Sequence, residues 1–234
     1  MSVTVVRDVE GQNGASATTW GPGNNGMATV TATQAGNMPA IVVCFSGSNG
    51  NVINTVADNK SNSWAKAKSV NPGASKLACE IWYVDPATAI AGITTVTVTF
   101  SVTATADGRF FEASGIANAP HDSTGGAVNN GSSTTPTVTG GTLAQADEWV
   151  LACCGYATTG TITLDTSHGW TNDAKTINSG TNKTDQQVSY QETAATTALT
   201  HAPTLGTTGN WVEVMAAFKV AGGVVVNSNM LMAI

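Results

Sequence analysis

The chain has 234 residues, of which 41% are hydrophobic and only 10% are charged, and its formal net charge is −6. This acidic balance, with nine scattered basic residues, argues against a nucleic-acid-binding protein. No apolar run reaches the roughly 18 residues of a transmembrane helix, and the first residues lack the pattern of a signal peptide. We therefore expect neither nucleic acid nor membrane among its partners.

The first 26 residues are predicted to form an extended arm. It begins with a short strand over Val3–Val6, which leads into a segment rich in Gly and Asn that has little means of building its own core. An isolated Trp in such a segment usually anchors it. We therefore predict that Trp20 docks on this domain or on a neighbouring subunit.

From residue 27 onward, strand-like runs alternate with turns. The runs in the first half cover residues 27–33, 39–46, 51–56, 63–70, 77–84, 93–102 and 109–115. Asp107-Gly108 is predicted to be a hairpin turn, and residues 117–133 a long polar loop that crosses between sheets. The runs in the second half cover residues 135–139, 148–156, 161–164, 170–175, 184–192, 195–200 and 210–220.

This pattern predicts an all-β fold: a single jelly-roll-like antiparallel β-sandwich over residues 27–221. The arm precedes it, and an apolar tail over residues 222–234 follows it. The tail either folds back onto its own domain or is buried against a partner subunit. The candidate assembly contacts are Trp20 and, in the tail, Val224, Val225, Val226, Met230, Leu231, Met232 and Ile234.

The four cysteines, Cys44, Cys79, Cys153 and Cys154, all fall inside predicted strands. We interpret them as buried, reduced thiols that pack as small apolar residues. The alternative is a disulfide between neighbouring strands. Since no CxxC spacing is present and no His lies near them in sequence, a zinc site is not expected.

Two polar segments resemble sites but are better explained as turns and loops. Residues 58–62 alternate oxygen ligands as calcium loops do, yet lack the glycine and the closing glutamate of such a loop, so an Asx-type turn is expected. Residues 165–173 contain two carboxylates, a His and a Trp, at a separation that the sequence does not determine. No established catalytic motif is present, and we predict no enzyme activity, cofactor or metal.

The six tryptophans suggest a second use for the surface. Trp82, Trp149 and Trp211 lie in apolar strands and are predicted to be core residues. Trp64 and Trp170 follow turns, so together with Tyr156 they would be the candidate glycan contacts of a sugar-binding protein.

The order of several motifs resembles a known family. These motifs are VADNKSNSW at 56–64, EIWYVD at 80–85, AGITTVTVTF at 91–100, FEASGI at 111–116, DEWVLA at 147–152 and GNWVEVMAAF at 209–218. Together they are similar to a jelly-roll β-sandwich domain found in bacteriophage virion proteins and bacterial surface proteins, over residues 27–220. The resemblance brings no catalytic residues, because members of the family serve as decoration, fibre, tail and adhesion modules.

The expected function is that of a non-enzymatic structural protein of a bacteriophage virion, specifically a capsid decoration or cement protein located in the virion. Its partners would be the major capsid protein or other virion subunits, and a homo-oligomer, with a trimer favoured. The alternative is a glycan-binding or host-adhesion module of the tail-fibre type. A polysaccharide hydrolase is the third and least favoured hypothesis.

Overall fold

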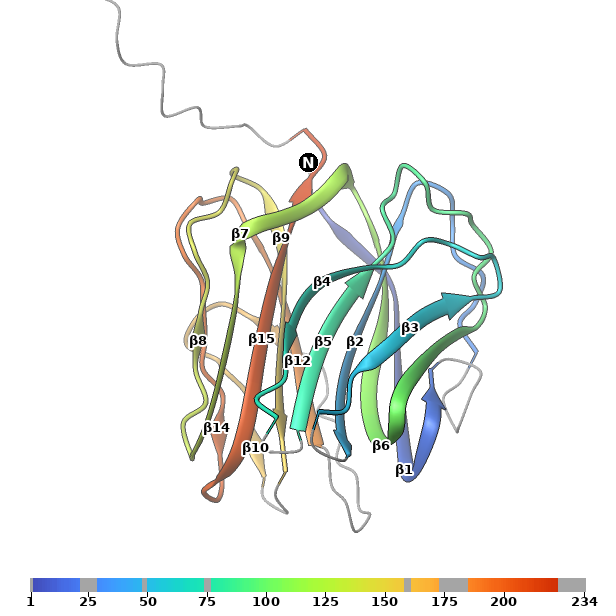
Figure 1. Ribbon diagram of the computed structural model, residues 1–234. Helices are drawn as coiled ribbons and strands as arrows, with labels where there is room; N and C mark the ends of the chain where they lie inside the picture. Colours follow the sequence, from blue (N-terminus) through green and yellow to red (C-terminus); the bar gives the residue numbers. More distant parts are fainter. Residues whose placement is uncertain are drawn as a thin grey trace, which may run out of the picture.

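Two antiparallel sheets pack face to face in the computed structural model, which describes residues 2–21, 29–47, 50–73, 77–157, 161–172 and 185–222 (Figure 1). The first sheet contains β1 (Thr4–Trp20), β2 (Met38–Gly47), β3 (Ile53–Asp58), β4 (Ala65–Val70), β5 (Leu77–Tyr83) and β6 (Val96–Ser114). The second contains β7 (Ile116–Ser133), β9 (Glu148–Tyr156), β11 (Thr171–Asn172), β12 (Asp185–Thr193) and β15 (Gly209–Val220). The predicted all-β sandwich is confirmed.

Two short ladders lie over the outer face of the second sheet (Figure 1). They pair β8 (Val138–Thr139) with β13 (Thr200–His201), and β10 (Ile162–Thr163) with β14 (Thr204–Leu205). No helix among the described residues is long and apolar enough to cross a membrane.

Each sheet is built by one half of the chain, and the two halves share one strand order. The order is β1-β6-β2-β5-β4 in the first sheet, where β3 also pairs with β6, and β7-β15-β9-β12-β11 in the second. In both, the first strand pairs with the last, the last with the second, and the second with the next-to-last. The chain changes sheets at Gly115, between β6 and β7.

Both faces of each sheet are covered. One hydrophobic cluster fills the space between the sheets, and it includes Val42 of the first sheet and Leu151 of the second. A further cluster covers the outer face of the first sheet, and two more cover the second. This explains why β2 and β9 are apolar almost without alternation: their side chains are buried on both sides.

Over residues 4–20 the expected N-terminal arm is a continuous strand, and residues 22–26 lie outside the described residues. β1 pairs with β6 along most of its length, with three register shifts, and forms an edge of the first sheet. The polar residues of β1 gave no sign of a strand, because its stability comes from backbone pairing with the long strand β6. Trp20 at its end is 0% exposed and packs in the outer cluster of the same domain.

Two further expectations are corrected. Asp107-Gly108 is no hairpin turn, because β6 runs straight through it and pairs there with both β1 and β2. Gly108 is needed for a close approach instead: a Cβ there would lie 2.2 Å from the Trp20 ring and 2.5 Å from the Val42 carbonyl oxygen. The expected loop at 117–133 is strand β7, paired with β15.

Candidate functional site

The predicted assembly residues fall into two groups. Trp20 contributes no surface to a partner, because its side chain is enclosed within its own domain. The tail residues Val224, Val225, Val226, Met230, Leu231, Met232 and Ile234 lie outside the described residues. Of the two alternatives for Trp20, the structure shows docking on its own domain, and assembly through the tail stays a prediction.

The predicted glycan contacts do not form one exposed platform. Tyr156 is 0% and Trp170 7% exposed, so neither ring offers a face on which a sugar could stack. Trp64 is half-buried, and its indole N–H donates to Asp58 Oδ2 at 2.7 Å. Among the predicted core tryptophans, Trp149 and Trp211 are buried, whereas Trp82 is half-buried.

The two polar turns occupy equivalent places, because each comes just before the last strand of its sheet in the shared order, β4 or β11. Asp58 Oδ1 accepts hydrogen bonds from the backbone N–H groups of Lys60 and Asn62, which confirms the Asx-type turn. Asp165 accepts from the N–H groups of Ser167 and Ala202 and lies 2.8 Å from His168 Nδ1.

Asp165 is a buried structural carboxylate within its turn. Burial alone would raise its pKa, but the Ala202 and Ser167 N–H groups and His168 hold the pKa below its ordinary value. The second carboxylate of this segment, Asp173, lies outside the described residues.

A Ser-His-Glu arrangement, which the sequence analysis missed, lies on the outer side of the second sheet. His201 Nε2 is 3.1 Å from Ser189 Oγ, and its Nδ1 is 3.3 Å from Glu213 Oε1. A nucleophile, a base and an orienting carboxylate are therefore in order. All three side chains are 0% exposed, and the Trp170 ring packs 5.1 Å from the imidazole. The three side chains are therefore enclosed beneath the outer layer of the second sheet.

A buried pair of carboxyl groups consists of Asp122 on β7 and Glu148 on β9. Burial, and then the Asp122 charge, raise the pKa of Glu148 to about 7. Burial would also raise the pKa of Asp122, but hydrogen bonds from Thr124, Ala144 and Gly125 hold it below its ordinary value. The pair therefore shares one proton near neutral pH, with Asp122 ionised.

Three of the four cysteines converge between the sheets. Cys44 and Cys79 lie opposite each other on β2 and β5 and form a disulfide, which corrects the expectation that all four thiols are free. Cys153 Sγ on β9 lies 3.3 Å from Cys44 Sγ. Cys154 points away, into a cluster on the outer face.

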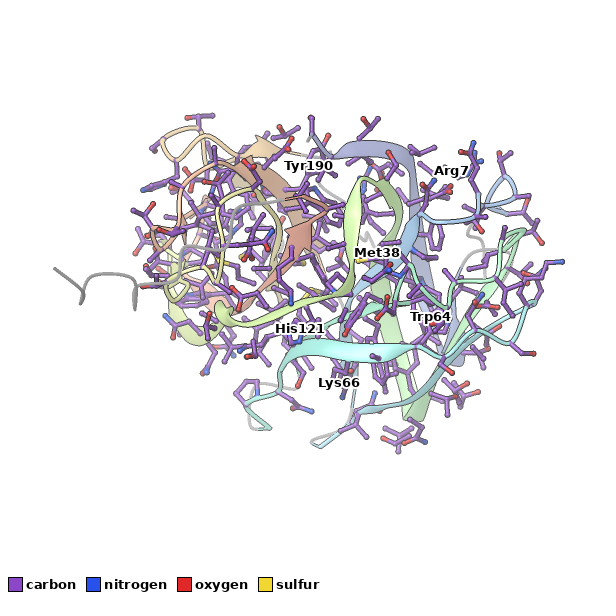
Figure 2. The ribbon with its side chains drawn as sticks, turned by 90° about the horizontal axis from the view of Figure 1, so that it is seen from above. Arg7, Met38, Trp64, Lys66, His121 and Tyr190 are labelled. Carbon is purple, nitrogen blue, oxygen red and sulfur yellow. A yellow bond between two sulfur atoms is a disulfide. The ribbon has the colours of Figure 1, made fainter. Side chains whose placement is uncertain are left out.

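A pocket of about 320 Å³ opens at one side of the sandwich, where β1 faces β11 and β12. The half-buried Tyr190 supplies aromatic surface, and the buried Trp149 packs behind it with ring centroids 6.3 Å apart. Glu192 also lines it, and its carboxylate accepts hydrogen bonds from the Val3 N–H and the Ser2 hydroxyl, both at 3.0 Å. Figure 2 places Tyr190 on the opposite side of the molecule from Lys66 of β4.

Both ends of the described chain meet beside Gly115. The Ala221 N–H donates to the Gly115 carbonyl oxygen at 2.8 Å, and a Cβ on Gly115 would lie 2.8 Å from the Ser2 carbonyl oxygen. Figure 1 likewise shows the N-terminus next to the end of β15. We call this end of the sandwich, defined by Ser2, Gly115 and Ala221, the terminal pole.

Comparison of the chain with protein-family models, with curated proteins and with solved structures gave no match in any of the three.

Proposed function

We propose that this chain is a non-enzymatic structural protein of a bacteriophage particle, used as a capsid decoration or cement subunit. The observation that carries the proposal is the terminal pole. Strand β15 ends there, and the apolar tail starts at Gly222, beside the first residues of the chain. A segment that starts at an end of a sandwich, next to a glycine with φ of 75°, is well placed to reach a neighbouring subunit.

The distribution of apolar residues supports this role. Among the described residues the exposed large apolar side chains are Val52, Ile90, Val102 and Val128. Residues 223–234 alone carry seven large apolar residues. Association through the tail would remove that surface from water, at roughly 25 cal/mol for each Å² buried.

The test compares the full chain with a chain that ends at Gly222. Antibody detection in phage particles purified from the source lysate should find the full chain in the particle fraction. We expect the truncated chain to keep its β-rich circular dichroism spectrum but to lose particle binding and self-association in sedimentation. Recovery of the full chain solely from the soluble fraction would refute the virion role.

The matched control is Val128→Ser, which removes an exposed apolar side chain of β7 while the tail remains. It should bind particles like the unmodified chain. If the truncation instead lowers the melting temperature sharply while particle binding persists, the tail is packing on its own domain.

A second candidate function, glycan binding, is favoured by the pocket between β1 and β12. The Tyr190 ring, the Glu192 carboxylate and the Thr171 hydroxyl are the kinds of group that bind sugars by stacking and hydrogen bonding. A glycan-array signal that Tyr190→Ala abolishes and Trp64→Ala leaves unchanged would support it. The reverse pattern would return the site to Trp64.

A further inference from the structure

The sulfur atoms of Cys44, Cys79 and Cys153 all lie within 4.8 Å of one another. They come from β2, β5 and β9, so the cluster joins the two sheets at the centre of the sandwich. Each of the three side chains is 0% exposed. Three soft ligand atoms thus converge although their residues are far apart in sequence.

A buried carboxylate lies near these sulfurs, although its oxygens do not lie within 4.8 Å of all three. Asp107 on β6 is the direct register partner of Cys44 and is 0% exposed. Directly opposite residues of an antiparallel pair project to the same face. Asp107 therefore lies on the face of the sheet that holds the sulfurs.

The space beside the sulfurs is kept open by Gly155 on β9. A Cβ at this position would lie 2.7 Å from both Cys44 Sγ and Cys79 Sγ. Zinc bound to thiolates at ~2.3 Å in a tetrahedron places its sulfurs about 3.8 Å apart. The sulfurs of Cys44 and Cys153 are already 3.3 Å apart, so the main change needed to reach that spacing is the separation of Cys44 from Cys79 once their bond is reduced.

We propose that Cys44, Cys79 and Cys153 form a zinc site that becomes available when the Cys44–Cys79 disulfide is reduced, and that the Asp107 side chain turns toward the sulfurs to supply the oxygen ligand. Three sulfurs and one carboxylate oxygen form a ligand set suited to zinc. Disulfide and metal exclude each other, because two of the ligands are consumed in the bond. The site is therefore redox-linked: oxidising conditions hold the disulfide, and reducing conditions hold the metal.

The chemistry balances with a phosphine reductant. The phosphine gives two electrons to the disulfide and takes the oxygen of a water molecule, so that it becomes a phosphine oxide. The two hydrogens of that water complete the two thiols. Zinc then displaces three thiol protons, which pass to solvent.

The experiment uses the full chain, refolded from denaturant because the ligands are enclosed. Refolding with a phosphine reductant and one equivalent of Zn²⁺, followed by gel filtration and elemental analysis, should leave one zinc per chain. Refolding with Co²⁺ should give an intense sulfur-to-cobalt charge-transfer band. The chain refolded without reductant should retain neither metal.

Cys153→Ser tests the site, and Cys154→Ser is the matched control, since it changes the neighbouring buried thiol on the opposite face. Cys153→Ser keeps the Cys44–Cys79 disulfide, so its folding is checked in the oxidised state by circular dichroism. We expect Cys153→Ser to lose stoichiometric zinc and the cobalt band, and Cys154→Ser to keep both. Reduced wild type that elutes free of zinc, or a Cys153→Ser chain that binds as the wild type does, would overturn the proposal. So would a Cys44–Cys153 disulfide as the sole product of refolding with zinc.

Discussion

The first half of the chain, residues 2–114, and the second half, residues 116–222, build sheets with the same strand order but link their strands differently. In the first sheet a disulfide joins β2 to β5. In the second sheet the strands in the equivalent places are β9 and β12. There Cys153 lies opposite Val188 and Cys154 lies opposite Gln187, so no disulfide joins these two strands. There the buried Ser189, His201 and Glu213 connect the sheet to the layer above it.

This difference indicates that the shared order rests on strands that are apolar on both faces, and not on any one linking group. Such strands can be stabilised covalently or by hydrogen bonds in a dry environment, and both solutions occur here. Four measurements would break or sharpen the comparison.

The largest effect is expected at Trp20, which covers the outer face of the first sheet. Its side chain is 0% exposed, and it packs against Gly108. Trp20→Ala should lower the free energy of unfolding by ~3–5 kcal/mol, through lost burial and the cavity left behind. Urea unfolding measures it, and a loss below about 1 kcal/mol would contradict the packing.

The disulfide should contribute next. It closes a loop with a sequence separation of 35 residues, so its reduction should cost ~2–4 kcal/mol. Unfolding midpoints measured with and without a phosphine reductant, both in a metal chelator, give the difference. Cys154→Ser is the control, and its response to reductant should equal that of the wild type. Equal midpoints would instead agree with the sequence-based expectation of reduced thiols.

The third effect belongs to the second half and depends on pH. The pKa of Glu148 is raised from 4.5 to about 7, so the folded chain binds its proton more tightly than the unfolded chain does. Stability from this proton is fully present below pH 4.5 and is lost as the pH rises through 7. The loss should be on the order of 2 kcal/mol, and Glu148→Gln should flatten the slope.

The unfolding free energies of wild type and Glu148→Gln, measured from pH 4 to 8, decide the matter. Asp122→Asn is the companion variant. It removes a neighbouring charge that raises the pKa of Glu148, so the loss of stability between low and neutral pH should be smaller. Parallel curves for wild type and Glu148→Gln would mean that this carboxyl titrates normally.

The smallest effect compares the two equivalent turns. Trp64 donates to the Asp58 carboxylate, whereas Trp170 donates to the Thr200 carbonyl oxygen at 2.8 Å. Phe at either position removes one hydrogen bond, worth ~0.5–1.5 kcal/mol. Trp170→Phe should cost more, because Trp170 is more buried and leaves a backbone carbonyl without this donor. Equal losses in urea unfolding would show that the turns are energetically alike.

Strands with apolar residues on both faces were predicted closely from sequence. The expected strands at 39–46, 77–84 and 210–220 match β2, β5 and β15 to within one or two residues. Of β1, only the start was predicted, as a short strand at 3–6, and β7 was not predicted, since both strands are rich in Gly, Asn, Ser and Thr. Their pairing with β6 and β15 is a long-range interaction that no local window contains.

By itself, the sequence determined the all-β class, the covered double-sided strands and the change of sheet near the middle, because hydrophobic patterning and turn residues act locally. The tertiary structure alone decided what distant residues do together. It enclosed Trp20, Tyr156 and Trp170, it brought Ser189, His201 and Glu213 into one network, and it gathered three cysteines from three strands. The physical reason is register: pairing between strands many residues apart sets which side chains face each other, and composition carries no record of it.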